Sequence, residues 1–296
     1  MTGTESIPKR QHFRSVLWQG RLTRVCLVIV AVYTLMALYG EGVYQWYTWS
    51  DQVAPYQVQN LRERFQPPGP DHWMGTDSLG RDVMGRLIQG TRIAFRVGIV
   101  TSLIAIPIGV LLGCLAGYFG GKVDDVIVWI YSTFASIPGL LFILSIAMVV
   151  GKGLLGIYLG IGLTTWVGVC RLIRAEVLKH RERPYVLAAR GLGYSHARIL
   201  FRHILPNVAH IVIIAFTVRF PASISTEVFM SFLGIGVQGE PSWGLMINSA
   251  RLRLWEGVWW EMTFVTLAVF LIVLSFNLLG DALRDALDPR LRTDGN

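Results

Sequence analysis

The chain has 296 residues, of which 53% are hydrophobic and 16% are charged, and its formal net charge is +8. A soluble domain carries about a quarter charged residues, so this composition excludes an ordinary soluble protein and favours a polytopic membrane protein. The positive charge does not indicate nucleic-acid binding, because the basic residues gather in segments that the topology below places in the cytoplasm.

Six apolar segments are long enough to cross a bilayer, which takes roughly 20 residues. They occupy residues 24–40, 94–118, 123–150, 154–174, 207–235 and 259–283. A bilayer offers no partner to an open strand edge, and the segments are too long for barrel strands, so all are predicted to be helices. The first is short and ends at Glu41. A cleaved signal peptide is its alternative, disfavoured because no small-residue cleavage pattern follows.

The order of these segments divides the chain into five parts. They are a basic cytoplasmic tail (1–23), a first membrane helix (24–40), an external segment (41–93), a core with the other five spans (94–283) and a second cytoplasmic tail (284–296). Lys and Arg are frequent in both tails and in the insert between spans four and five. The positive-inside rule therefore places both termini in the cytoplasm.

Two of the predicted spans carry glycines four residues apart. Gly109, Gly113 and Gly117 form a row on the second span, and Gly156 and Gly160 form a pair on the fourth. Such rows let helix backbones approach closely. They fit sliding contacts in a moving bundle or ordinary helix packing, and the second interpretation is favoured.

Arg219 and Glu227 lie inside the fifth predicted span, eight residues apart and so on one broad helical face. Ionisable groups at this depth are costly and usually face a cavity or a partner. They either line or gate a polar path or act as structural charges between helices, and the sequence leaves both open. Pro221 weakens the backbone hydrogen bonding between them and predicts a local bend.

The sequence contains no signature of catalysis. GxxxxGK[ST], HExxH and CxxC are all missing, and the six histidines have no metal-ligand spacing. Three cysteines, Cys26, Cys114 and Cys170, fall in apolar spans and are predicted to be free. We therefore expect neither catalytic residues nor a metal site, and any uphill transport must draw on another subunit or on ion coupling.

Residues 176–207 form a basic, polar insert between two apolar spans. Pro184 can open a short helix, and Gly193 fits the left-handed turn that ends one. Ser195 can cap a second helix, which is predicted to run until Pro206 stops it. Two short helices joined by a glycine turn form a rigid element that another protein can bind.

The insert resembles the EAA loop of permease subunits of bacterial ATP-binding-cassette (ABC) importers, through YVLAARGLG at 185–193 and HILPN at 203–207. Over about 72–290 the chain is similar to the C-type permease of the dipeptide/oligopeptide importer family. The other stretches that carry this likeness are HWMGTDSLGRDVMGRLIQGTRI (72–93), GYFGGKVDD (117–125), EVFMSFLGIGVQ (227–238), PSWG (241–244) and NLLGDALRDALDPR (277–290).

The resemblance implies an all-α polytopic membrane protein of the bacterial inner membrane. Its fold would be that of a type I ABC importer permease, with six transmembrane helices and cytoplasmic coupling helices. The implied partners are a sister permease, two cytoplasmic ATPase subunits that bind ATP and Mg²⁺, and an external substrate-binding protein. This chain itself would hold no cofactor. The insert would dock into a groove on one ATPase.

By position in the motif, the resemblance assigns the coupling role to seven residues. They are Tyr185, Ala188, Ala189, Gly193, His203, Leu205 and Pro206. A valine at position 193 is expected to uncouple transport, because β-branched residues resist a positive φ angle.

The sequence departs from the family pattern at four places. Leu187 replaces the glutamate that gives the loop its name, and Pro184 stands where an acidic residue is common. The stretch GVQGEPSWG is one residue shorter than usual, and 41–71 matches nothing in the family.

The function that follows is half of an ATP-driven pore for dipeptides or oligopeptides, working by alternating access. The same machine could carry a nickel chelate, an oligosaccharide or glutathione. An ion-driven carrier is an alternative of another class, typically with inverted repeats and buried acid networks. A membrane scaffold would show no substrate-dependent ATPase activity.

Overall fold

The computed structural model describes residues 20–287, which fold into a bundle of helices that contains no strand. The long helices are α2 (Arg21–Trp49), α3 (Val83–Phe119), α4 (Gly121–Ser136), α5 (Gly139–Val150), α6 (Leu154–Thr164), α7 (Trp166–Arg181), α10 (Leu205–Phe232) and α12 (Trp260–Leu287). Most of the two predicted tails, 1–23 and 284–296, lies outside the described residues.

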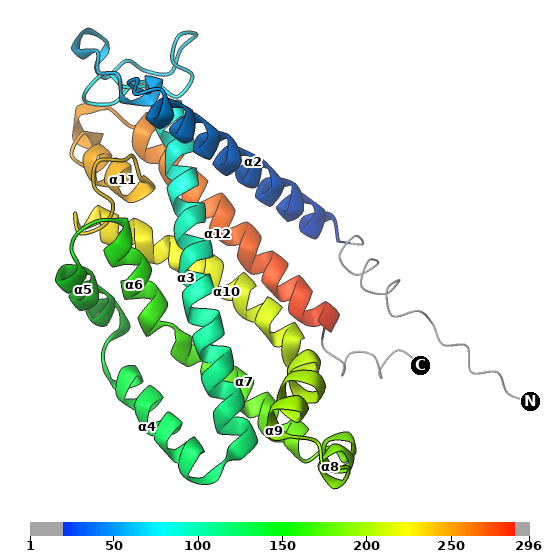
Figure 1. Cartoon of the computed structure of the whole chain (residues 1–296). Coiled ribbons are helices and arrows are strands. Elements are labelled where there is room, and N and C mark those ends of the chain that lie inside the picture. Colours follow the sequence, from blue (N-terminus) through cyan, green and yellow to red (C-terminus); the bar gives the residue numbers. More distant parts are fainter. Residues whose placement is uncertain (1–19, 288–296) are drawn as a thin grey trace, which may run out of the picture.

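Shorter helices connect the long ones. They are η1 (Pro55–Gln57), η2 (Leu61–Glu63), α8 (Pro184–Gly191), α9 (His196–Arg198), the π-helix η3 (Ile199–Ile204), α11 (Trp243–Arg251) and η4 (Leu254–Glu256). Figure 1 shows the connection from α2 to α3 at one end of the bundle and α8 and α9 at the other.

The membrane helices agree with the prediction in number. Within residues 20–287, five helical segments are long and apolar enough to cross a membrane, and α4 with α5 makes a sixth if this bent pair is one span. The fourth predicted span is interrupted at Thr165, between α6 and α7, and it continues to Arg181 instead of ending at 174.

The flanking helices extend into the predicted external segment, 41–93, at both ends, whereas its place outside the membrane stays a prediction. Helix α2 does not end at Glu41 but runs to Trp49, because that carboxylate is satisfied by Arg96 (2.6 Å) and by the Gln45 amide (2.8 Å). Helix α3 begins at Val83 and not at 94, since Asp82 caps it by accepting the Gly85 amide at 2.7 Å. Residues 50–82 therefore form the connection between α2 and α3.

The third predicted span, 123–150, is not one helix. Helices α4 and α5 meet at an angle of 90°. Pro138 causes the break, because a proline forces the residue before it out of the helical region, and Ile137 has an extended backbone (φ −88°, ψ 132°). By contrast, Pro107 in α3 and Pro221 in α10 lie within helices.

The glycine rows are contact surfaces between helices. A Cβ atom on Gly113 of α3 would lie 2.7 Å from the carbonyl oxygen of Cys170 in α7. One on Gly160 of α6 would lie 2.9 Å from the carbonyl oxygen of Ile143 in α5. The close backbone approach is thus confirmed, whereas sliding at these contacts stays a prediction. The cysteines Cys26, Cys114 and Cys170 are free and buried, as expected.

Candidate functional site

The insert forms a sharply defined turn between α8 and α9. Pro184 occupies the first turn of α8, and Gly193 has the predicted positive φ, 73°. The Tyr194 amide donates to the Ala189 carbonyl (3.1 Å) and the Gly193 amide to the Arg190 carbonyl (2.9 Å). These two bonds are those of a Schellman motif, which fixes the direction of the chain as it leaves a helix.

The second half of the insert differs from the prediction at Pro206. Ser195 caps α9 as expected, accepting the Arg198 amide at 3.4 Å. Pro206, however, stops no helix: the chain passes through the π-helical stretch Ile199–Ile204 directly into α10, and Pro206 lies in the first turn of α10. A proline there removes no intrahelical hydrogen bond, and the π stretch shifts the hydrogen-bond register just before it.

The two alanines of the motif face opposite ways. Ala189 is buried with Val186 in a cluster that includes Ile199 and residues of α3 and α7. Ala188 is exposed on the outer side of α8. Only Ala188 is therefore accessible to a partner, while Ala189 seats α8 on the bundle.

Tyr185 and His203 each make an aromatic contact that stiffens the insert. The Tyr185 hydroxyl hydrogen-bonds His180 Nδ1 at the end of α7 (2.7 Å), and partial burial raises the pKa of Tyr185. The His203 ring stacks on Tyr194, with centroids 5.8 Å apart. Leu205 is partly buried against the same apolar cluster as Ala189, whereas Pro206 is exposed.

A second set of contacts ties the insert to α3, and α7 to α4. Tyr118, near the end of α3, hydrogen-bonds His196 Nδ1 through its hydroxyl (2.9 Å), and the Arg190 guanidinium lies over its ring at 5.2 Å. Arg174 of α7 makes a two-pronged ion pair with Asp124 of α4, at 2.5 and 2.6 Å. Sequence reasoning did not single out these residues. The available signal was GYFGGKVDD, which contains both Tyr118 and Asp124.

The two charges of the fifth span do not join each other in the part of the chain that the structure describes. The Arg219 guanidinium donates to the Thr165 carbonyl, at the break between α6 and α7. Glu227 is 1% exposed and accepts a hydrogen bond from Ser231 at 2.7 Å. The same Ser231 hydroxyl accepts the amide of Val237, in the loop after α10. Both side chains therefore hold irregular backbone in place, and a role in a polar path stays a prediction.

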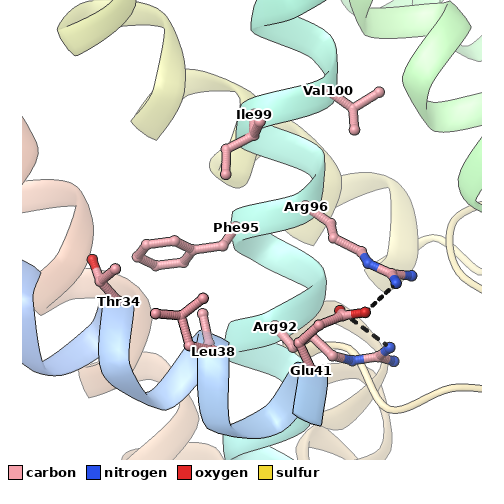
Figure 2. Close-up of a pocket in the computed structure, with 9 residues that line it drawn as sticks. Thr34, Leu38, Glu41, Arg92, Phe95, Arg96, Ile99 and Val100 are labelled. Carbon is pink, nitrogen blue, oxygen red and sulfur yellow. Dashed lines mark hydrogen bonds and ion pairs between the residues drawn. The ribbon is translucent and has the colours of Figure 1, made fainter. Parts of the chain in front are cut away.

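A cluster of charges that the sequence did not reveal lies at the other end of the bundle. Arg92 of α3 is 1% exposed, pairs with Glu240 of the α10–α11 loop and lies over the Tyr44 ring at 3.8 Å. Figure 2 shows Glu41 of α2 reaching between Arg92 and Arg96, with distances of 3.9 and 2.6 Å. These charges lie at one end of a mainly apolar pocket between α2 and α3. Within residues 20–287, no group of three or more His, Cys, Asp or Glu residues could hold a metal ion.

Comparison with known proteins places these features in a family. The family model "binding-protein-dependent transport system inner membrane component" matches residues 109–293. The chain belongs to this family. The permease is 40% identical over 243 residues to the dipeptide transport system permease protein DppC of Bacillus subtilis, covering 81% of this chain and 76% of that protein. It is 35% identical over 282 residues to the oligopeptide transport system permease protein OppC of B. subtilis, covering 95% and 88%.

The fold of the permease is also that of a solved ABC transporter. It aligns with a chain of the inward-facing MetNI methionine ABC transporter with a TM-score of 0.54 and 19% identity, over 70% of this chain and 98% of that one. The family match includes the insert, Arg219 and Glu227 of the permease but neither Glu41 nor Arg92. The charge cluster at the opposite end therefore lies partly outside the segment that defines the family.

Proposed function

We propose that this permease forms half of the translocation pore of an ATP-driven importer for dipeptides or oligopeptides, with a sister permease as the other half. The observation that carries the proposal is the rigid segment 184–204 of the basic insert, in a member of the binding-protein-dependent transport family. The peptide cargo is supported by the relatives DppC and OppC, whose names specify dipeptide and oligopeptide transport.

In this proposal, two cytoplasmic ATPase subunits bind ATP and Mg²⁺ and hydrolyse the nucleotide. An external binding protein delivers the peptide at the end of the bundle that holds residues 50–82. Both termini then lie in the cytoplasm, on the side of the insert. The Lys and Arg residues of both tails and of the insert support this orientation, because cytoplasmic segments are rich in Lys and Arg.

The insert would pass ATPase movement to the membrane helices as a rigid lever. Its two aromatic ties, Tyr118 to His196 and Tyr185 to His180, connect it to α3 and α7. Its C-terminal end continues into α10 without a flexible linker. A push on the insert must therefore displace these three helices together, which is what alternating access requires. Because nucleotide and docked binding protein then bias one equilibrium, each raises the affinity for the other.

The decisive experiment is uptake into proteoliposomes that contain the complete complex. We expect labelled dipeptide to enter only with ATP and the binding protein, and the loaded binding protein to stimulate ATP hydrolysis. Uptake that follows an imposed ion gradient without ATPases would establish an ion-driven carrier instead. If there is neither uptake nor stimulated hydrolysis, the remaining alternative is a membrane scaffold without a transport role.

The same vesicles separate the cargoes of one machine. Glutathione and nickel appear in the names of further relatives, at 38% and 35% identity, so glutathione and a nickel chelate are tested beside the peptide, together with an oligosaccharide. Preferential uptake of any of these, with the same ATP requirement, would replace peptide as the cargo and keep the rest of the proposal.

A further inference from the structure

The outer surface of the insert combines exposed apolar side chains with unpaired positive charge. Leu187 is 48% exposed, Leu192 73% and Phe201 59%. Single exposed apolar residues are ordinary on a protein surface. Val186, Ala189 and Ile199 of the same segment are buried in a cluster with residues of α3 and α7. Three large exposed side chains within fifteen residues of such a segment indicate a surface that a partner covers.

The charge of this surface has one sign. Residues 183–207 contain four arginines and no aspartate or glutamate. The arginines are Arg183, Arg190, Arg198 and Arg202, and all four are exposed. Two of them lie over tyrosine rings, Arg190 over Tyr118 and Arg198 over Tyr194, each at 5.2 Å. In the described part of the chain, none of the four forms an ion pair with a carboxylate, whereas their neighbour Arg181 pairs with Glu182 at 2.8 Å.

Covering such a surface without acceptors would be costly. A guanidinium that loses water on binding needs a hydrogen-bonding or charged partner, since an unpaired buried charge is strongly unfavourable. The positive-inside rule explains why arginines are present here. It does not explain why none of the four pairs with an acid, nor why Leu187 stands where the family usually has a glutamate.

We propose that the ATPase groove which receives this insert has an apolar floor for Leu187 and an acidic rim for the arginines. This inference rests on the proposed function, because it assumes that an ATPase subunit covers the insert. Beyond that function, it specifies which chemical groups line the ATPase groove. A groove with a cation placed to bind a glutamate would offer Leu187 no favourable contact. In this proposal the ATPase groove is instead matched to leucine at this position.

The test is rebinding of the cognate ATPase to the permease. The intact importer is purified from its own cells, its ATPase is stripped and purified, and the dissociation constant is measured on permeases in phosphatidylcholine nanodiscs. Leu187→Glu would bury a carboxylate on the apolar floor, close to the acidic rim, and is expected to weaken binding at least tenfold, which corresponds to ~1.4 kcal/mol. Leu187→Gln has nearly the same shape without the charge, so it measures the loss of the apolar contact alone.

The arginines are tested through salt dependence. Arg202→Gln is expected to weaken binding about tenfold at low salt and to make the dissociation constant less sensitive to salt. The matched control is Lys122→Gln, an exposed cation at the start of α4, at the same end of the bundle but outside the insert. It should leave both the affinity and its salt dependence unchanged.

Several outcomes would overturn the inference. Leu187→Glu binding as tightly as wild type or more tightly would show that the groove is not acidic there. An effect of Arg202→Gln that appears only in discs containing anionic lipid would assign the charge to the membrane surface. The proposed function itself fails on a different result, namely that no ATPase accompanies the intact chain or that the stripped ATPase does not rebind to wild type.

Discussion

Gly193 is the residue at which a small change should separate ATP hydrolysis from transport. Its φ of 73° lies in the left-handed region, and a Cβ atom added there would meet nothing within 4 Å. The penalty is therefore conformational, about 1–2 kcal/mol for an L-residue in this region, and higher for valine because of its β-branch. A change of that size alters a conformational equilibrium by a factor of roughly 5–30. Here the equilibrium is between the Schellman turn and other backbone conformations, in which α9 would leave α8 in a different direction.

Gly191, two residues earlier, provides a matched control. A Cβ atom added there would also meet open space, but Gly191 lies within α8 and has no positive φ. Gly191→Ala should stabilise the helix by about 0.5–1 kcal/mol. The pair Gly191→Ala and Gly193→Ala adds the same methyl group to the same surface and differs only in the backbone angle.

The assay is the number of ATP molecules hydrolysed per peptide imported, measured in proteoliposomes at equal levels of assembled complex. We expect this ratio to rise for Gly193→Ala and further for Gly193→Val, and to stay at the wild-type value for Gly191→Ala. Wild-type coupling in Gly193→Val would refute the coupling turn. Equal loss in both alanine variants would show that bulk on this surface matters and that the backbone angle does not.

Two further predictions concern the stability of the bundle. Gly113→Ala would place a methyl group 2.7 Å from the Cys170 carbonyl oxygen, so it should force α3 from α7 and lower the unfolding free energy by about 1–3 kcal/mol, as read from thermal unfolding in detergent; an unchanged midpoint would contradict the close packing. Glu240→Gln leaves the buried Arg92 charge with only the more distant Glu41 carboxylate, at 3.9 Å. The expected loss is about 1.5–3 kcal/mol, the value of a hydrogen bond to a charged group. Glu256→Gln at an exposed pair should cost under about 1 kcal/mol, and equal losses would refute the role of burial.

The parts of the structure that the sequence predicted correctly depend on short-range chemistry. Pro184 opens α8, Gly193 adopts a positive φ and Ser195 caps α9. Each of these features is decided within about four residues of chain. The glycine row on α3 is similarly readable, because the spacing alone places the glycines on one face, although the sequence does not say that α7 is the helix they meet.

The errors arose where a residue's partner lies far away in the sequence. Glu41 marked the end of the first span only because its partner Arg96, 55 residues later, could not be seen. Arg92 and Glu240 are separated by 148 residues. Proline gave a second kind of ambiguity, because Pro138 breaks a span and Pro206 does not. Pro206 lies in the first turn of α10, where a proline removes no intrahelical hydrogen bond.

Several charged side chains of this permease support a helix break or a loop. Arg219 binds the backbone at the break between α6 and α7, Glu227 supports the loop after α10 through Ser231, and the Arg92–Glu240 pair holds the far end of that loop. A break in a membrane helix or a loop folded against one leaves backbone groups that lipid cannot satisfy. Charges at these points stabilise irregular backbone, and these contacts offset part of the cost of placing a charge within the bundle.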